Sequence, residues 1–179
     1  MNPYTIINKY YPQENELKHL LLVHSHAVAH KAVEMARLHP ELRMDAAFIE
    51  EAALLHDIGI FLTNAPSIYC FGSEPYIRHG LLGARLMREE GYPRHAWVCE
   101  RHTGIGLTKE EIIKQQLPLP HQDFVPVSLE EQAICFADTF YSKTHHLTEA
   151  RTLEEVVKAQ SRFDENAPKI IDKWSKMFL

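Results

Sequence analysis

The sequence predicts an all-α fold, a single domain of about six to eight helices that spans residues 1–179. Apolar residues recur at steps of three and four, and no segment alternates strictly between apolar and polar residues as a half-buried strand does. Glycine, which is unfavourable inside helices, accounts for only 7 residues. With 45% hydrophobic residues, the chain is long enough to bury a core of its own.

The N-terminal part of the chain is predicted to contain four helices. The first has a break near His24 and ends at Pro40. The second and third are followed by Gly59 and Gly91, and glycine readily adopts the left-handed conformation that ends many helices. We expect these four helices at about residues 15–38, 44–57, 77–90 and 93–103.

Capping boxes predict where three later helices begin. In this motif Ser or Thr precedes Glu by three residues, and the two side chains satisfy the first backbone N–H groups of the helix. The pairs are Thr108 with Glu111, Ser128 with Glu131, and Thr152 with Glu155. They predict helices at about 109–116, 129–142 and 153–167, followed by a last turn or two after Pro168. Two long loops, 61–75 and 117–127, are expected to set the substrate range.

Charge and cysteine use exclude several classes of protein. The formal charge is -5, so neither duplex nucleic acid nor a membrane surface is an expected partner. The three cysteines form no C-x-x-C pair, which excludes a disulfide framework and a thiolate zinc site and fits a reducing cytoplasm. We see no signal peptide and no apolar stretch of the roughly 18–20 residues that span a bilayer, so we expect a cytoplasmic protein.

Histidine is unusually frequent, with 12 residues in the chain. Four histidines and two aspartates fall on the inward faces of predicted helices, near helix ends or on the long late helix. These six residues are His24, His56, Asp57, His79, His102 and Asp138. Burying such groups without partners is costly, and divalent cations satisfy imidazoles and carboxylates together. A donor set without thiolate suits iron, manganese, zinc or cobalt.

The adjacent pair His56 and Asp57 adds to this prediction. Successive helical residues point about 100° apart, so the imidazole can face one metal while the carboxylate reaches across to a second. The C-terminal end of a helix carries partial negative charge, which favours a cation at that place.

The order of these residues resembles the HD superfamily of metal-dependent phosphohydrolases. Three matching motifs carry the resemblance: His24-Ser25 with Val28-Ala29, His56-Asp57-Ile58-Gly59, and Ala137-Asp138. The second motif is the signature of the HDIG branch. The resemblance covers about residues 20–142 and implies a helical bundle of the HD-domain type, on which the C-terminal helices at 152–177 pack.

The two additional histidines make the chain similar to the dinuclear subgroup, which includes bacterial hydrolases of diadenosine tetraphosphate. This resemblance implies two divalent ions, iron first, with manganese, cobalt or zinc as alternatives. It implies that one metal is held by His24, His56 and Asp138, that the other is held by His79 and His102, and that Asp57 bridges them. The implied activity is hydrolysis of a phosphate ester or anhydride in a nucleotide-like small molecule by a metal-activated hydroxide.

One position departs from the family pattern, because Ile60 stands where many HDIG members have Lys. A cation that contacts substrate phosphate must then come from elsewhere. We rank Arg101 and Lys143 first as catalytic residues, since one is next to His102 and the other is five residues beyond Asp138. The remaining candidates for binding substrate are Arg78, Arg85 and Lys109.

Two other functions fit the same residues. One is a di-iron oxygenase of the same superfamily, and the other is a non-catalytic nucleotide-sensing protein. The expected partner is a phosphorylated small molecule, and a homodimer is left open. The two tryptophans are predicted to be in the core. We expect the other histidines at the surface, with a zinc site at His26 and His30 as the alternative for that pair; the rest are His19, His39, His95, His121, His145 and His146.

Overall fold

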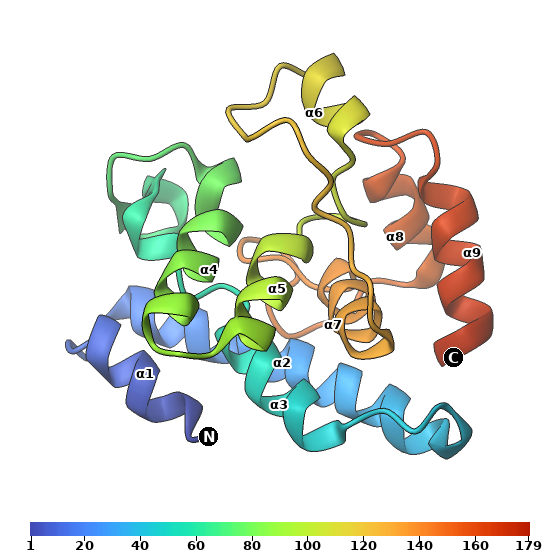
Figure 1. The fold of residues 1–179 in the computed structure, drawn as a ribbon, viewed down its shortest axis with the longest axis horizontal. Coiled ribbons are helices and arrows are strands. Elements are labelled where there is room, and N and C mark those ends of the chain that lie inside the picture. The colour runs from blue at the N-terminus through green and yellow to red at the C-terminus, as the bar shows by residue number, and fades with distance from the viewer.

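The computed structural model describes residues 1–179 and contains nine α-helices (Figure 1). They are α1 (Pro3–Tyr10), α2 (Glu16–Leu38), α3 (Ala46–Leu55), α4 (His79–Glu89), α5 (Pro93–Arg101), α6 (Lys109–Lys114), α7 (Leu129–Thr139), α8 (Leu153–Gln160) and α9 (Ala167–Phe178). The predicted all-α fold is confirmed, although the number of helices exceeds the predicted six to eight.

Short elements fill the segment that the sequence predicted as the 61–75 loop. Strands β1 (Asn64–Ala65) and β2 (Cys70–Phe71) pair antiparallel, with Asn64 opposite Phe71. The single-turn 3₁₀ helices of the chain are η1 (Pro40–Leu42), η2 (Ile60–Leu62), η3 (Pro66–Ile68) and η4 (Tyr76–Arg78). The strands are too short to show the alternation by which a sequence reveals a strand.

Side-chain caps fix most helix starts as predicted. Thr108, Ser128 and Thr152 each accept a hydrogen bond from the backbone N–H three residues later. Only Thr152 completes the reciprocal capping box. At α7 the Glu131 carboxylate instead accepts from the backbone N–H of Val127 and from Arg101. A capping sequence therefore placed these helix starts correctly even where the reciprocal bond is not made.

The helix predictions were wrong at four places. Helix α1 was not predicted, although Asn2 followed by Pro3 is a helix-start signal and Asn2 caps Tyr4. Helix α2 is unbroken at His24. Helix α8 ends at Gln160 rather than at 167, and α9 is a helix of 12 residues rather than a turn or two. The unbroken α2 shows that one buried polar residue does not interrupt a helix whose backbone hydrogen bonds remain intact.

Gly59 does not end α3 in the predicted left-handed conformation, since its φ is -86°. A Cβ at this position would lie 2.4 Å from the backbone N of Gly83 and 2.5 Å from the backbone O of His79. Gly59 therefore lets the chain after α3 approach the backbone of α4. Gly91 has φ +84°, so the prediction for the end of α4 is confirmed.

The core consists of two large apolar clusters, which meet along α2, α3 and α5, and of a third cluster of only three residues, Ile112, Leu119 and Phe124. On α2, Leu21 belongs to the smaller cluster and Val28 to the larger one, and His24 lies between them. The smaller cluster joins α1 to α4 and α5, while the larger one joins α7 to α8 and α9. Figure 1 shows α1 and α9 on opposite sides of the molecule. The seam between the clusters passes through the middle of the bundle.

Helices α8 and α9 pack on the larger cluster, as predicted for the C-terminal helices. Val156, Ile171 and Phe178 are fully buried, and Trp174 donates a hydrogen bond from Nε1 to Gln132 Oε1 at 3.1 Å. The predicted core position of Trp97 is wrong, because its side chain is 41% exposed. No helix has the length and apolar character needed to cross a membrane.

Candidate metal centre

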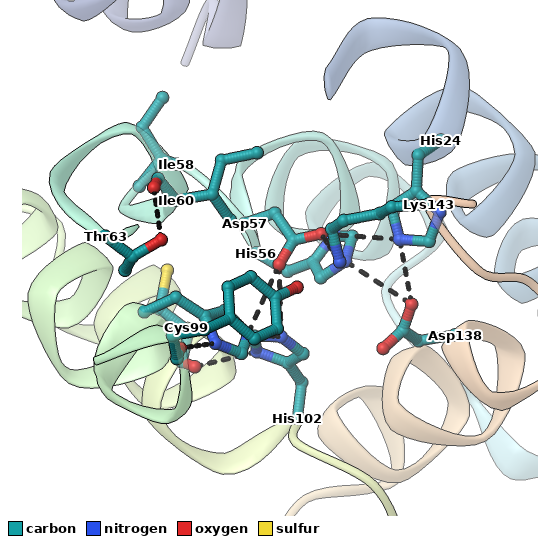
Figure 2. Close-up of polar contacts among 12 residues, drawn as sticks. His24, His56, Asp57, Ile58, Ile60, Thr63, Cys99, His102, Asp138 and Lys143 are labelled. Carbon is teal, nitrogen blue, oxygen red and sulfur yellow. Dashed lines mark hydrogen bonds and ion pairs between the residues drawn. The ribbon is translucent and has the colours of Figure 1, made fainter. Parts of the chain in front are cut away.

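The six predicted metal ligands come together at the seam between the two apolar clusters. Five of them lie at or beside helix ends or in the middle of α2, and Asp138 projects from α7 (Figure 2). His56 and Asp57 follow the last residue of α3, His79 is the first residue of α4, and His102 follows the last residue of α5. All except Asp138 are at most 4% exposed. The helix ends thus bring polar groups into a region that the helix interiors keep apolar.

Asp57 lies between two groups of histidine nitrogens. Its Oδ2 is 3.3 Å from His24 Nε2 and 3.1 Å from His56 Nε2. Its Oδ1 is 3.4 Å from His79 Nε2 and 3.5 Å from His102 Nε2. The two oxygens of one carboxylate therefore face two different pairs of imidazoles.

Asp138 joins the first pair only. Its Oδ1 is 3.0 Å from His24 Nε2 and 3.6 Å from His56 Nε2. His24, His56 and Asp138 offer ligand atoms within 4.8 Å of one another, and so do His56, Asp57 and His102. Both groups can hold a metal ion.

Backbone carbonyls orient three of the four imidazoles. Nδ1 of His56 donates to Ala53 O at 2.6 Å. Nδ1 of His79 donates to Tyr76 O at 2.8 Å. The same bond from His102 to Cys99 O measures 2.7 Å. Because a carbonyl only accepts, each of these Nδ1 atoms carries a proton. Whenever such a ring is neutral, its Nε2 lone pair therefore points into the centre, as in histidines that bind metals.

These lone pairs leave the centre short of positive charge and of donors. His79 Nε2 and His102 Nε2 are 3.1 Å apart, and two such acceptors cannot bond to each other when both rings are neutral. Both ring nitrogens of His24, His56 Nε2 and Asp57 Oδ1 are buried without a hydrogen bond of normal geometry. Buried polar atoms in this state are costly, and cations in the centre would satisfy His24 Nε2, His56 Nε2 and Asp57 Oδ1.

The electrostatics of the protein without metal show the same need for a cation. Burial lowers the pKa of His79 to about 3, so this imidazole is neutral. Burial alone would also lower the pKa of His56, but the carboxylates of Asp57 and Asp138 outweigh it and raise this pKa to about 10. The positive charges of His56 and Lys143 in turn hold the pKa of Asp57 well below its usual value, against the effect of burial. A proton on His56 thus supplies part of the missing positive charge.

Lys143 supplies further positive charge to the centre. Of the five basic residues predicted to contact substrate, it is the one that reaches the six candidate ligands. Its Nζ is 2.6 Å from Asp57 Oδ2, and its side chain is 12% exposed. It comes from the loop between α7 and α8 and lies over Asp57 (Figure 2). The carboxylate of Asp57 outweighs the effect of burial and raises the pKa of Lys143, which keeps the ammonium charged.

Tyr76 was not predicted as part of the site. Its ring stacks on His79 with a centroid distance of 4.6 Å, and Lys143 Nζ lies 5.9 Å from the centroid of the Tyr76 ring. Burial raises its pKa, so its hydroxyl stays protonated. The spacing was a possible sequence signal, because Tyr76 is three residues before His79. At that spacing its backbone carbonyl can accept the hydrogen bond that orients the His79 imidazole.

The other four predicted basic residues lie outside this group. Arg101 Nη1 pairs with Glu131 Oε2 at 3.0 Å, and its guanidinium lies 5.3 Å from the Trp97 ring centroid. Arg78 pairs with Glu74, and the exposed Arg85 pairs with Glu89. Lys109 is exposed. Position in the sequence next to a ligand is a weak guide, because the residue after or before a ligand on a helix points away from it.

The remaining histidines are mostly outside the core, with one exception. His95 was predicted to be exposed, but it is buried, and its Nε2 lies 3.3 Å from Glu51 Oε2. His26 and His30 are exposed. The His26 ring instead meets the Tyr4 hydroxyl, with Nε2 at 3.2 Å.

A cavity of about 300 Å³ opens the centre to ligands. Its walls include His24, Asp138, Lys143 and Tyr76. Ser67 and Ile68, from the predicted 61–75 loop, close one side. A small molecule in this cavity would contact His24, Asp138 and Lys143, whereas Asp57, His56, His79 and His102 do not line it.

Relatives of the chain include proteins of two kinds. It is 32% identical over 159 residues to Uncharacterized protein MJ0778 of Methanocaldococcus jannaschii, which covers 88% of this chain and 82% of that protein. It is 35% identical over 124 residues to a tRNA (cytidine(56)-2'-O)-methyltransferase of Picrophilus torridus and 31% identical over 123 residues to the protein of the same name from Thermoplasma volcanium. These matches cover 69% and 68% of this chain but only 32% of each methyltransferase. No solved structure matches the chain.

A family model described as HD domain matches residues 21–142. This range includes all six residues of the candidate metal centre, and the match spans well over half of the chain. The structure adds a helical bundle in which five of these residues, all except His79, form groups able to hold metal. The chain belongs to the HD domain family, whose members are generally metal-dependent phosphohydrolases.

Proposed function

We propose that this chain is a metal-dependent phosphohydrolase that cleaves a phosphate ester or anhydride in a nucleotide-like small molecule. The position of Asp57 carries the proposal. Its Oδ2 faces His24 and His56, and its Oδ1 faces His79 and His102. One buried carboxylate is thus placed to bridge two cations, which is the arrangement that hydrolysis of phosphate esters uses in two-metal sites.

In this proposal each group of side chains has one task. His24, His56 and Asp138 hold one divalent ion, His79 and His102 hold the second, and Asp57 contacts both. The donors are imidazoles and carboxylates, which suit iron and also manganese, cobalt or zinc. When bound, the two ions supply an activated water and neutralise charge on the phosphoryl oxygens.

The protein side chains would bind and orient the substrate. Once cations compensate the charge of Asp57, the Lys143 ammonium would be free to donate to a phosphoryl oxygen. Lys143 would then do the work of the Lys that many HDIG members have where this chain has Ile60. The Tyr76 hydroxyl, which stays protonated, faces the same cavity and can donate a second hydrogen bond. Hydrolysis breaks one P–O bond, joins the water oxygen to phosphorus and leaves the second fragment as an alcohol or a phosphate.

Two observations support a small nucleotide as substrate. The cavity beside the centre measures about 300 Å³, which admits a phosphate with part of a sugar but not a folded polymer. The net charge of -5 disfavours a long polyanion.

The test is phosphate release by the purified chain loaded in turn with iron, manganese, cobalt or zinc. The substrates are nucleoside monophosphates, dinucleoside polyphosphates and ribose 5-phosphate. A matched pair of variants on α2 controls for the metal centre, His24→Ala inside it and His30→Ala at the exposed surface six residues later. We expect His24→Ala to lose more than about 90% of the activity and part of the bound metal, and His30→Ala to keep both.

Absence of hydrolysis with every metal would contradict the proposal, measured as released phosphate or, for the dinucleoside polyphosphates, as nucleotide products. Oxygen consumption by the iron-loaded chain would then favour the di-iron oxygenase, whose oxygen chemistry needs the same ligands. Tight nucleotide binding without turnover would favour the nucleotide-sensing protein.

A further inference from the structure

A second cavity of about 520 Å³ lies next to the metal centre. Its first wall is the loop 103–107, which begins at the residue after His102. Helix α6 forms another wall through Glu111 and Gln115. Gln160, at the end of α8, and the two residues Phe163 and Asp164 complete it. We call this cavity the chamber.

The chamber and the cavity of the metal centre share part of their walls. Tyr76 and Ser142 line both of them. Tyr76 stacks on His79, and Ser142 precedes Lys143, so the shared wall consists of neighbours of two residues at the centre. A ligand with its phosphate against Lys143 and its other end in the chamber would lie along this shared wall.

Two contacts give the chamber a fixed shape. Gly104 and Gly106 have φ of +61° and +91°, and a Cβ on Gly104 would lie 3.2 Å from Gln160 Oε1, so the loop backbone runs close to the end of α8. Across the chamber, Gln115 Nε2 donates to Phe163 O at 2.9 Å and ties α6 to the segment after α8. This close approach and this hydrogen bond bring the end of α8 and the segment after it against residues 104–115.

The lining combines apolar walls with polar groups. Ile77, Ile105 and Leu107 provide apolar surface, and the rings of Tyr76 and Phe163 add aromatic surface. The polar groups are amides and carboxylates, from Gln115, Gln160, Glu111 and Asp164. Phe163 is 69% exposed although it is a large aromatic residue, which leaves its ring available to a ligand. Planar heterocycles with donors and acceptors on their edges match such a lining.

We propose that the chamber binds the nucleobase of the substrate, with the phosphate at the metal centre and the sugar beside Tyr76. This inference rests on the proposed function, since it assigns the substrate class of that same site as nucleoside phosphates rather than sugar phosphates. Gln160, Phe163 and Asp164 lie beyond residues 21–142, which the family model matches. Recognition of the base is then a property that this chain adds to the HD domain.

The experiment compares the affinities of nucleoside monophosphates with that of ribose 5-phosphate, measured by calorimetry on the metal-loaded chain. Base stacking on an aromatic side chain changes affinity by roughly tenfold or more. We expect the nucleotides to bind about tenfold more tightly than ribose 5-phosphate. Phe163→Ala should bring this ratio close to one. The bond from Gln115 goes to the backbone of Phe163 and remains in the variant.

Phe71→Ala is the matched control. Phe71 is also an exposed phenylalanine, at 78%, but it does not line the chamber. The control should keep the tenfold ratio of the unchanged chain. Leu107→Trp, which fills the chamber from the loop, provides a second variant and should lower the ratio as Phe163→Ala does.

Equal affinities for nucleotides and ribose 5-phosphate in the unchanged chain would overturn the inference, and so would a ratio that neither Phe163→Ala nor Leu107→Trp alters. If the chain hydrolyses phosphate esters but shows such a result, the base site is wrong and the phosphohydrolase remains. If nucleotides bind with the expected dependence on Phe163 but nothing is hydrolysed, the base site stands and the phosphohydrolase is wrong.

Discussion

The metal centre and the chamber share a wall, but they are built in different ways. The centre collects six side chains from helices packed in the core, and backbone carbonyls orient three of its imidazoles. The chamber is bounded by a loop, by the short helix α6 and by the segment after α8, and one of its two aromatic residues, Phe163, is exposed. All ligands of the centre lie inside the part that matches the HD domain, whereas part of the chamber lies outside it.

This difference shows how one fold can combine fixed chemistry with variable recognition. Ligands of the centre must stay within a few tenths of an ångström of one another, so they are attached to the most rigid elements. The chamber only has to offer a surface of suitable shape, and loops at the edge of a rigid scaffold can change without loss of the core. Changes in the centre should therefore affect chemistry and stability, and changes in the chamber should affect the choice of substrate.

The largest effect is expected for Asp57→Ala. Without the carboxylate that faces both pairs of imidazoles, neither metal is held properly, and the rate of phosphate release should fall by more than about hundredfold. The bound metal, measured by elemental analysis, should fall with it. Binding of a nucleoside that lacks phosphate should stay unchanged, because the chamber does not include Asp57.

Asp57→Asn is the control for this variant, since it keeps the size of the side chain but cannot bridge two cations as a carboxylate does. It should behave like Asp57→Ala in metal content and in rate. Full metal content in both variants would show that Asp57 is not a shared ligand. A loss of nucleoside binding in both would show that the centre and the chamber are one site.

Removal of metal by a chelator is expected to have the next largest effect, on stability. The ligands connect α2, α3, α4, α5 and α7 across the seam of the two apolar clusters, so bound metal stabilises the folded state. A ligand at about 100 times its Kd adds about 2.7 kcal/mol. For a chain of this length we expect the Tm to fall by roughly 5–10 °C, as measured by calorimetry.

The control is Phe163→Ala, which should leave the Tm within about 1 °C, because exposed side chains contribute little. An unchanged Tm after removal of metal would contradict the role of the centre as a link between the two clusters.

Much of the centre was predictable because each ligand stands at a helix end or on an apolar helix face. A polar residue at such a place must find a partner, and six of them in one sequence point to a common one. The resemblance to the HD domain, which the comparisons confirm, supplied the order of the ligands. The resemblance also implied that Asp57 bridges the two groups. The structure adds which oxygen faces which pair of imidazoles, because this depends on how α3 is placed relative to α4 and α5.

The chamber was not predictable, for a physical reason. Its walls are formed by residues that belong to no motif in the sequence, such as Gln160 and Leu107. Only tertiary packing brings these residues together. The predicted loop 117–127 reaches the chamber through Leu117 alone. The missed helix α1 has a related cause, because eight residues with few buried side chains give only a weak periodic pattern.

The last and smallest expected effect concerns Lys143, which lies where the centre and the chamber meet. Lys143→Met keeps most of the apolar length of the side chain and removes the charge that faces Asp57 Oδ2. If Lys143 donates to the substrate phosphate, loss of one charged hydrogen bond should lower kcat/KM by about tenfold while the bound metal stays constant. Arg101→Met is the matched control, since Arg101 pairs with Glu131 away from the centre. Because Glu131 is buried, this change should cost roughly 1–3 kcal/mol of stability, but it should leave kcat/KM of the folded chain unchanged. The measurement that separates the possible roles of Lys143 is the ratio of nucleotide affinity to ribose 5-phosphate affinity in Lys143→Met. A role in binding phosphate weakens both ligands alike and leaves the ratio unchanged, because both carry the phosphate. A fall in the ratio would show that Lys143 contributes to binding of the base. Base recognition would then extend beyond Tyr76 to a residue of the metal centre.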